Sequence, residues 1–240
     1  MKKIASKRKT WKRLVPLVLL IVALGACSTT NTNSTGTSSS STSKKTTTKT
    51  SNYFTKRDQD ASYDESKATK ISLSGSSAKT SGSGAEMSGS TVTITKAGTY
   101  VLSGSSKNVQ VVVKVGDQDK VQLVLNGVTM TGTDAAIVVE NADKTFITLA
   151  KGSKNTISDS ANHKNTDYDA AIYSKDDLTF NGSGSLTVEG KYGNAIESND
   201  DLRITGGTYT IKGYKNALSA NDAINIKDAT MNLTATEDAI

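Results

Sequence analysis

The sequence has 240 residues, including one Cys, one His, one Trp and one Pro, and its formal net charge is +6. Residues 1–50 hold ten of the 29 Lys and Arg and none of the 23 acids, so residues 51–240 carry a net charge of −4. The basic excess belongs to the N-terminal segment, and the remainder gives no indication of nucleic-acid binding. A single cysteine excludes a disulfide within the chain.

The N-terminus has the layout of an export signal. Seven Lys and Arg stand within residues 1–13, an apolar run covers residues 14–23, and Leu24-Gly25-Ala26-Cys27 follows. A basic start, a short apolar core and small residues before a cleavage site are typical of a signal peptide, and the run is shorter than the ~20 residues that span a bilayer. L-G-A-C resembles a bacterial lipobox, which implies that residues 1–26 are removed and Cys27 is lipidated. The alternative is an ordinary secretory peptide with an incidental cysteine.

Ser, Thr, Asn and Lys make up nearly all of residues 28–52. Such a segment cannot bury enough apolar surface to offset its ordering entropy, so we predict a disordered tether over residues 27–66 and a folded domain over residues 67–240. Lipidation at one residue anchors a protein without making it span the membrane. We therefore expect a monomer held by a lipid at the extracellular face of the cell membrane.

From about Lys70 onward, short runs alternate apolar and polar residues, as at 91–95 and 121–125, and Gly, Asn and Asp punctuate them. This period of two predicts strands, and no window has helical periodicity. The first of these runs are expected to form short N-terminal strands that precede a repeated unit.

Alanine recurs at fixed intervals in the second half of the chain, and an aliphatic residue follows each one. The members of this column are Ala171, Ala195, Ala217 and Ala239. A period of 22–24 residues with several strands per unit predicts the coils of a parallel β-helix, a solenoid, with the alanines at an inward corner. Right-handed coiling is the usual hand of parallel crossovers.

Two further expectations follow from this column. Asn194 and Asn216 directly precede two of the alanines and are expected to stack at a coil corner. Residues 237–240 have the pattern of the start of another coil, so we expect the natural protein to continue beyond residue 240, because a solenoid needs a terminal cap.

Acidic turns recur five residues after the column alanines. With the residues beside them, they form a candidate metal-binding set: Asp176, Asp177, Asp200, Asp201, Asp222, Asn199 and Asn221. Stacked coils place equivalent carboxylates ~4.8 Å apart, so solvent, lysine or a hard cation must relieve their repulsion. Oxygen ligands of this kind suit Ca²⁺. The alternative is that these residues only form turns, which Asp and Asn favour.

Three tyrosines, Tyr168, Tyr192 and Tyr214, each stand three residues before a column alanine. Rings repeated at one coil position could form a platform for sugar rings, and with Lys191 and Lys215 they are our candidate glycan-binding residues. The alternative is a stabilising ladder of tyrosines without a ligand.

Catalytic signals are few. His163 is the single histidine and lies in a polar insertion at 158–167, which favours a loop role over a role as general base. Arg203, with Lys191, Lys212 and Lys215 near it in the sequence pattern, could supply the base of a calcium-dependent polysaccharide lyase.

The ordered series of motifs resembles a known family. The motifs are T-V-T-I-T-K-A-G-T-Y-V-L-S-G (91–104), V-Q-L-V-L-N-G-V-T-M (121–130), D-A-A-I (134–137), F-I-T-L-A-K-G-S-K-N-T-I (146–157), A-I-Y-S-K-D-D-L-T-F-N-G-S-G-S-L-T-V (171–188) and D-D-L-R-I-T-G-G-T-Y-T-I (200–211). From about residue 70 to its end, the chain resembles a bacterial family of secreted carbohydrate-binding β-helix proteins, named after a clostridial protein that binds cellulose and polygalacturonate.

The resemblance implies a right-handed parallel β-helix similar to pectate lyases, bound calcium, and binding of acidic or cellulosic polysaccharide without a need for catalysis. The Asp-Asp turns at 176–177 and 200–201 match the family pattern, whereas the third turn departs from it with Asp222-Ala223. Our main hypothesis is a lipid-anchored protein that binds polysaccharide noncatalytically with calcium. The alternatives are a calcium-dependent uronate lyase, and a structural stalk or adhesin whose partner is a protein.

Overall fold

A computed structural model describes residues 53–240, so the predicted signal peptide, Cys27 and the first part of the predicted tether lie outside the described residues. The described part consists of strands and turns without a helix, which confirms the predicted all-β class. It follows that residues 53–240 contain no helix long and apolar enough to cross a membrane.

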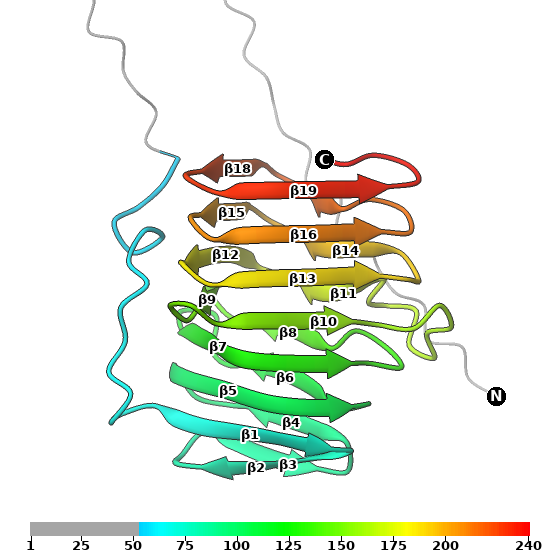
Figure 1. Cartoon of the computed structure of the whole chain (residues 1–240). Helices are drawn as coiled ribbons and strands as arrows, with labels where there is room; N and C mark the ends of the chain where they lie inside the picture. Colours follow the sequence, from blue (N-terminus) through cyan, green and yellow to red (C-terminus); the bar gives the residue numbers. More distant parts are fainter. Residues whose placement is uncertain (1–52) are drawn as a thin grey trace, which may run out of the picture. The chain divides into compact units, whose positions relative to one another are not determined.

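Two antiparallel hairpins form one end of a stack of parallel strands (Figure 1). They are β1 (Thr69–Gly75) with β2 (Ser77–Ser81), and β3 (Ala85–Ser88) with β4 (Thr91–Ile94). One strand of each hairpin also pairs in parallel with the next coil, β1 with β5 (Gly98–Lys107) and β4 with β6 (Gln110–Lys114). These are the short N-terminal strands expected from the sequence.

The long strand β7 (Lys120–Thr131) divides one sheet into two arms. On one side it pairs with β5, and on the other its first half pairs with β9 (Lys144–Leu149) and its second half with β10 (Lys154–Ser158). Gly127 lies between the two halves at φ 75°, a backbone conformation that glycine adopts without the steric cost of a side chain. Each later coil therefore has three short strands.

The remaining strands stack in parallel on these. The first arm continues through β12 (Asp177–Gly182), β15 (Leu202–Thr205) and β18 (Ile224–Lys227), and the second arm through β13 (Ser185–Gly190), β16 (Thr208–Gly213) and β19 (Thr230–Ala235). The other sheet runs from β6 through β8 (Ile137–Asn141), β11 (Ala170–Ser174), β14 (Asn194–Ser198) and β17 (Leu218–Ala220). The predicted solenoid of stacked coils is confirmed, whereas its right hand stays a prediction.

The interior follows the repeat seen in the sequence. Ala171, Ala195 and Ala217 are fully buried, and so are Ile172 and Ile196 beside them. Burying an aliphatic side chain of this size contributes ~1.5–3 kcal/mol, so the column is a main source of stability. Only Ala239, in the last coil described, is exposed.

The predicted asparagine stack is also present. The Asn194 Oδ1 accepts a hydrogen bond from the Asn216 backbone N–H at 3.1 Å, and the Asn216 Oδ1 accepts one from the Asp238 N–H at the same distance. Each asparagine side chain therefore accepts a hydrogen bond from a backbone N–H group of the following coil at the corner.

Residues 53–66, which we name the strap, lie along the first arm (Figure 1). Asp58 is fully buried, and its Oδ1 accepts hydrogen bonds from Lys144 Nζ at 3.2 Å and Thr179 Oγ1 at 3.0 Å. The Arg57 guanidinium stands 4.3 Å from the centre of the Phe146 ring. The C-terminal part of the predicted tether, residues 53–66, is therefore ordered against the solenoid. Specific polar contacts hold this segment, although it buries little apolar surface of its own.

Candidate functional site

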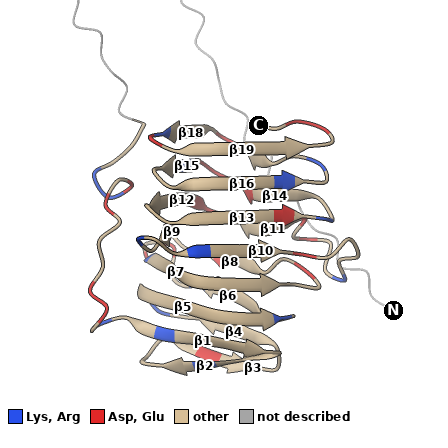
Figure 2. Cartoon of the chain, in the orientation of Figure 1, with Lys and Arg blue, Asp and Glu red and all other residues tan. Residues whose placement is uncertain are grey.

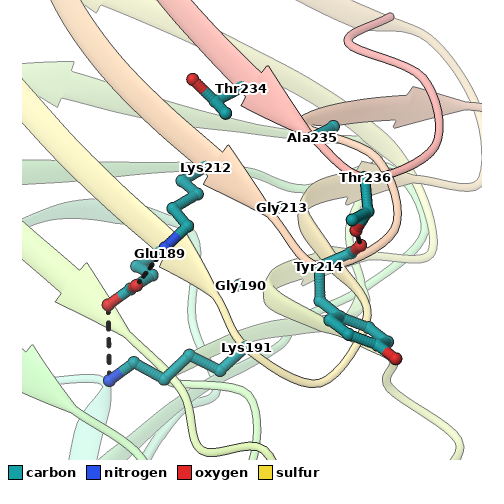
Figure 3. A pocket seen from close by; sticks show the side chains of 9 residues that line it. All are labelled: Glu189, Gly190, Lys191, Lys212, Gly213, Tyr214, Thr234, Ala235 and Thr236. Atoms are coloured by element: carbon teal, nitrogen blue, oxygen red, sulfur yellow. Dashed lines mark hydrogen bonds and ion pairs between the residues drawn. The ribbon is translucent and has the colours of Figure 1, made fainter.

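A groove of about 300 Å³ lies where three strands of the second arm end (Figure 3). The strand ends are in register, because Gly190 of β13 pairs with Gly213 of β16, and Gly213 pairs with Ala235 of β19. The side chains around these three positions are Glu189, Lys191, Lys212, Tyr214, Thr234 and Thr236. The groove thus brings together two of the predicted glycan-binding residues, Lys191 and Tyr214.

Glycine is required at the floor of the groove because the chain turns back closely on itself there. A Cβ on Gly190 would lie 2.2 Å from the carbonyl oxygen of Asn194, and a Cβ on Gly213 only 1.8 Å from that of Asn216. Both distances are far below van der Waals contact, so no other residue fits without a shift of the backbone. The tight turn places the following residues, Lys191 and Tyr214, on the outer side.

Charge in the groove is arranged around one carboxylate. Glu189 lies 3.2 Å from Lys212 Nζ and 3.5 Å from Lys191 Nζ, and Figure 3 shows both amines directed at it. The hydrogen bond from Lys212 and the charges of both lysines hold the pKa of Glu189 below its usual value. Figure 2 shows the same pattern as an acidic segment at the end of β13 beside a basic one at the end of β16.

The groove therefore combines an ionised carboxylate, two cations and an exposed aromatic ring. The Tyr214 side chain is 61% exposed, and its ring points away from Glu189 along the rim (Figure 3). An exposed ring offers an apolar face to a sugar, while amines and hydroxyls offer hydrogen bonds. Glycoside hydrolysis usually needs two carboxyls in different protonation states, whereas Glu189 is the one carboxyl among the groove's lining residues.

The other two predicted tyrosines have different surroundings. The Tyr192 ring stacks on His163, with 4.3 Å between ring centres and 13° between planes. Tyr168 packs against Tyr173 at 5.1 Å and donates its hydroxyl to Glu140 Oε1 at 3.0 Å. Burial, together with that carboxylate, raises the pKa of Tyr168 to about 12. Of the three rings, Tyr214 is the one left open to a ligand.

His163 fixes the insertion between β10 and β11. Its Nε2 lies 2.9 Å from Asp159 Oδ2, its Nδ1 lies 3.0 Å from the Tyr168 carbonyl oxygen, and its side chain is buried. The loop role expected from the sequence fits this arrangement. Lys215 is likewise engaged outside the groove, 3.1 Å from Asp169 Oδ2.

The acidic turns of the candidate metal set divide into two groups. Asp177 and Asp201 form ion pairs with Arg203, and Asp177 also lies 3.0 Å from Lys144 Nζ. Arg203 is thereby committed to carboxylates, which disfavours it as the base of a lyase.

The second group comprises Asp176, Asp200 and Asp222. Partial burial, and then the charges of the neighbouring aspartates, raise the pKa of Asp200. Asp176 Oδ2 accepts the Ala142 backbone N–H at 2.9 Å. Asn199 Nδ2 donates to the Tyr173 hydroxyl, and Asn221 is exposed. Across residues 53–240, no three His, Cys, Asp or Glu side chains converge on a point that could hold a metal ion.

Sequence reasoning missed several members of these clusters. Asp58 was assigned to the tether, and Glu197 and Tyr173 were not singled out. Polar residues stand at the strand positions of Thr179 and Arg203, which pair in register, and this pattern gave no sign that the face is covered.

The family model described as "Carbohydrate-binding domain-containing protein" matches residues 88–240. The chain belongs to this carbohydrate-binding domain family. A protein of the same description from Acetivibrio thermocellus is 40% identical over 127 residues, which cover 50% of this chain and 44% of that protein. This carbohydrate-binding domain protein thus spans less than half the length of that relative.

The fold is similar to a solved structure described as a polysaccharide lyase-like protein from C. thermocellum, a gadolinium derivative. The TM-score is 0.62 at 24% identity, and the match covers 72% of this chain and 93% of that one. At this identity, the likeness shows the fold alone. The family expected from the sequence motifs is confirmed, and the clostridial origin of its relatives fits.

Proposed function

We propose that this carbohydrate-binding domain protein binds polysaccharide noncatalytically in the groove at the ends of β13, β16 and β19. The observation that carries the proposal is Tyr214, 61% exposed beside Lys191 and Lys212 in a chain of this family. An amphipathic ring and flexible amines are the groups that a sugar chain with hydroxyl or carboxylate substituents can use. Acidic glycans such as polygalacturonate, and cellulose-like glycans, are the ligand classes that we infer.

Three further parts of the proposal rest on the sequence. Lipidation of Cys27 would hold the protein at the extracellular face of the cell membrane, which is supported by the L-G-A-C motif. Calcium would relieve the repulsion among Asp176, Asp200 and Asp222, the acids that Arg203 does not neutralise. The coils would be right-handed, which is the usual hand of parallel crossovers.

Affinity electrophoresis in gels that contain polygalacturonate or hydroxyethylcellulose, with and without chelator, tests this function. We expect glycan to retard the protein, and Tyr214→Ala to weaken binding roughly three- to tenfold, the worth of one aromatic contact. Tyr53→Ala is the matched control, because Tyr53 is 60% exposed but lies outside the groove.

Retention of full affinity by Tyr214→Ala would show that the groove is not the site. Appearance of an unsaturated product that absorbs in the ultraviolet would contradict a noncatalytic role. A loss of retardation with chelator would support calcium, and unchanged retardation would count against it.

A further inference from the structure

The hydrogen bonds that fasten the strap to the solenoid all run in one direction. In each of them, a side chain of the solenoid donates and an oxygen of the strap accepts. The donors, with their acceptors, are Lys144 and Thr179 (Asp58 Oδ1), Thr205 and Asn181 (Asp58 O), Asn181 again (Asp60 O), Arg203 (Tyr53 O), Lys227 (Gln59 Oε1) and Gln122 (Ser62 O). The outer face of the first arm is therefore a surface of donors, which we name the donor track.

The donor track runs across the coils. Its members stand on β7, β9, β12, β15 and β18, which are neighbouring strands of one sheet. Neighbouring strands lie ~4.8 Å apart, so the track offers donors at short, regular intervals along the solenoid axis. A linear chain that carries oxygens at regular intervals matches this spacing better than a compact ligand does.

The central donors of the track are buried beneath the strap, whereas Lys227 at its end is exposed. Thr179 and Asn181 are fully buried, Thr205 is 7% exposed and Lys144 is 9% exposed. Thr179 finds its acceptor in the Asp58 carboxylate at 3.0 Å, so removal of the strap would leave this hydroxyl open to another acceptor. Polar groups are seldom buried so deeply without a partner, which makes the covered track a prepared binding surface.

The central contact is with a carboxylate. Burial raises the pKa of Asp58, but hydrogen bonds from Thr55 and the charge of Lys144 outweigh it and leave the pKa below its usual value. Asp58 is thus ionised at neutral pH. The cations Lys144 and Arg203 on either side are balanced by Asp177 and Asp201, so the site accepts one carboxylate through oriented donors and not through a large excess of positive charge.

We propose that the donor track is a binding site for an acidic polysaccharide and that the strap is an internal stand-in for this ligand. The Asp58 carboxylate occupies the place of a uronate carboxylate, and the strap carbonyl oxygens occupy places of sugar oxygens. The ligand class follows the proposed function, but the track lies on the first arm and shares no residue with the Tyr214 groove on the second.

The first test compares Asp58→Ala with Asp60→Ala in the full chain that also carries Tyr214→Ala, with polygalacturonate as the probe. Asp60 is the matched control, because its carboxylate is exposed and bonds only to Ser62. We expect Asp58→Ala to raise affinity at least tenfold and Asp60→Ala to leave it unchanged. Adding Thr179→Val to Asp58→Ala should remove the gain. An unchanged affinity in a folded Asp58→Ala protein would overturn the proposal even if Tyr214 proves essential in the groove.

The second test needs no substitution in the strap. Trypsin cleaves after Lys56 and Arg57, which lie within the strap, and cleavage there requires the strap to leave the track. We expect saturating polygalacturonate to speed this cleavage at least fivefold in the wild-type chain and neutral hydroxyethylcellulose to leave it unaffected. Unchanged or slower cleavage with polygalacturonate would refute displacement of the strap by the glycan. Because this test uses the wild-type chain, it tests the proposal even if Asp58→Ala fails to fold.

Discussion

The carboxyl pair of Glu197 and Asp169 predicts an unusual dependence of stability on pH. Burial first, and then the hydrogen bond and charge of Asp169, raise the pKa of Glu197 to about 7, against the opposing hydrogen bond from Asn194 Nδ2 at 2.6 Å. Asp169 stays ionised, because hydrogen bonds and the charge of Lys215 outweigh its burial and lower its pKa. Glu197 is therefore the protonated partner of the pair below neutral pH.

The direction and the size of this change in stability follow from the difference between the Glu197 pKa in the folded and in the unfolded chain. Between its ordinary pKa of 4.5 and about 7, Glu197 holds a proton in the folded chain and has lost it in the unfolded chain. The stability that this group contributes is fully present below the unfolded pKa and is lost as pH rises to the folded pKa. A shift of this size corresponds to about 3 kcal/mol, so unfolding should become easier by an amount of that order between pH 4.5 and 7.5.

Urea unfolding, followed by circular dichroism at half-unit steps from pH 4.5 to 8, measures this loss. Glu197→Gln cannot ionise, so its stability should vary much less over the same range. Glu189→Gln is the matched control, because the pKa of Glu189 is lowered and the group titrates below this window. Parallel profiles for the wild type and Glu197→Gln would refute the reasoning.

Three other substitutions test the fold. Ile196→Ala in the fully buried column should cost about 2–5 kcal/mol of unfolding free energy by urea titration, and a cost under 1 kcal/mol would contradict the packing described. Gly213→Ala, whose Cβ would meet the Asn216 carbonyl at 1.8 Å, should lower stability by about 1–3 kcal/mol or more, whereas Thr210→Ala on an exposed position should change it little. His163→Ala removes the partner of buried Asp159 and should lower the unfolding free energy by about 2–3 kcal/mol. The same substitution should speed tryptic cleavage after Lys164. A loop that resists trypsin as well as the wild type does would show that the contact is dispensable.

The sequence repeat predicted those features of the fold that arise from contacts between equivalent residues of neighbouring coils. The alanine column, the aliphatic residues after it and the asparagine stack were expected because equivalent residues of successive coils must meet. A strand pattern has no comparable information about what covers its outer face. Thr179 and Thr205 look like ordinary exposed strand residues, and the strap that buries them has no periodicity of its own.

The three tyrosines show that residues at the same position of the repeat can have different surroundings in the structure. They occupy one position of the repeat, but the insertion between β10 and β11 supplies His163 to cover Tyr192, and Tyr173 packs against Tyr168. Only Tyr214 keeps an open ring. The acidic turns diverge for a similar reason, because Arg203 neutralises Asp177 and Asp201 but does not pair with Asp200.

The direction of the strap has a mechanical consequence. Tyr53 at its N-terminal end contacts Arg203 on β15, Asp58 contacts β12 and β9, and Ser62 contacts β7 before the chain reaches β1, so tension applied from the N-terminal side loads the contact of Tyr53 first. Bonds loaded one after another peel at low force, whereas bonds that share a load resist together. Complete peeling would release 14 residues, about 50 Å of extended chain, without unpairing a single strand of the solenoid.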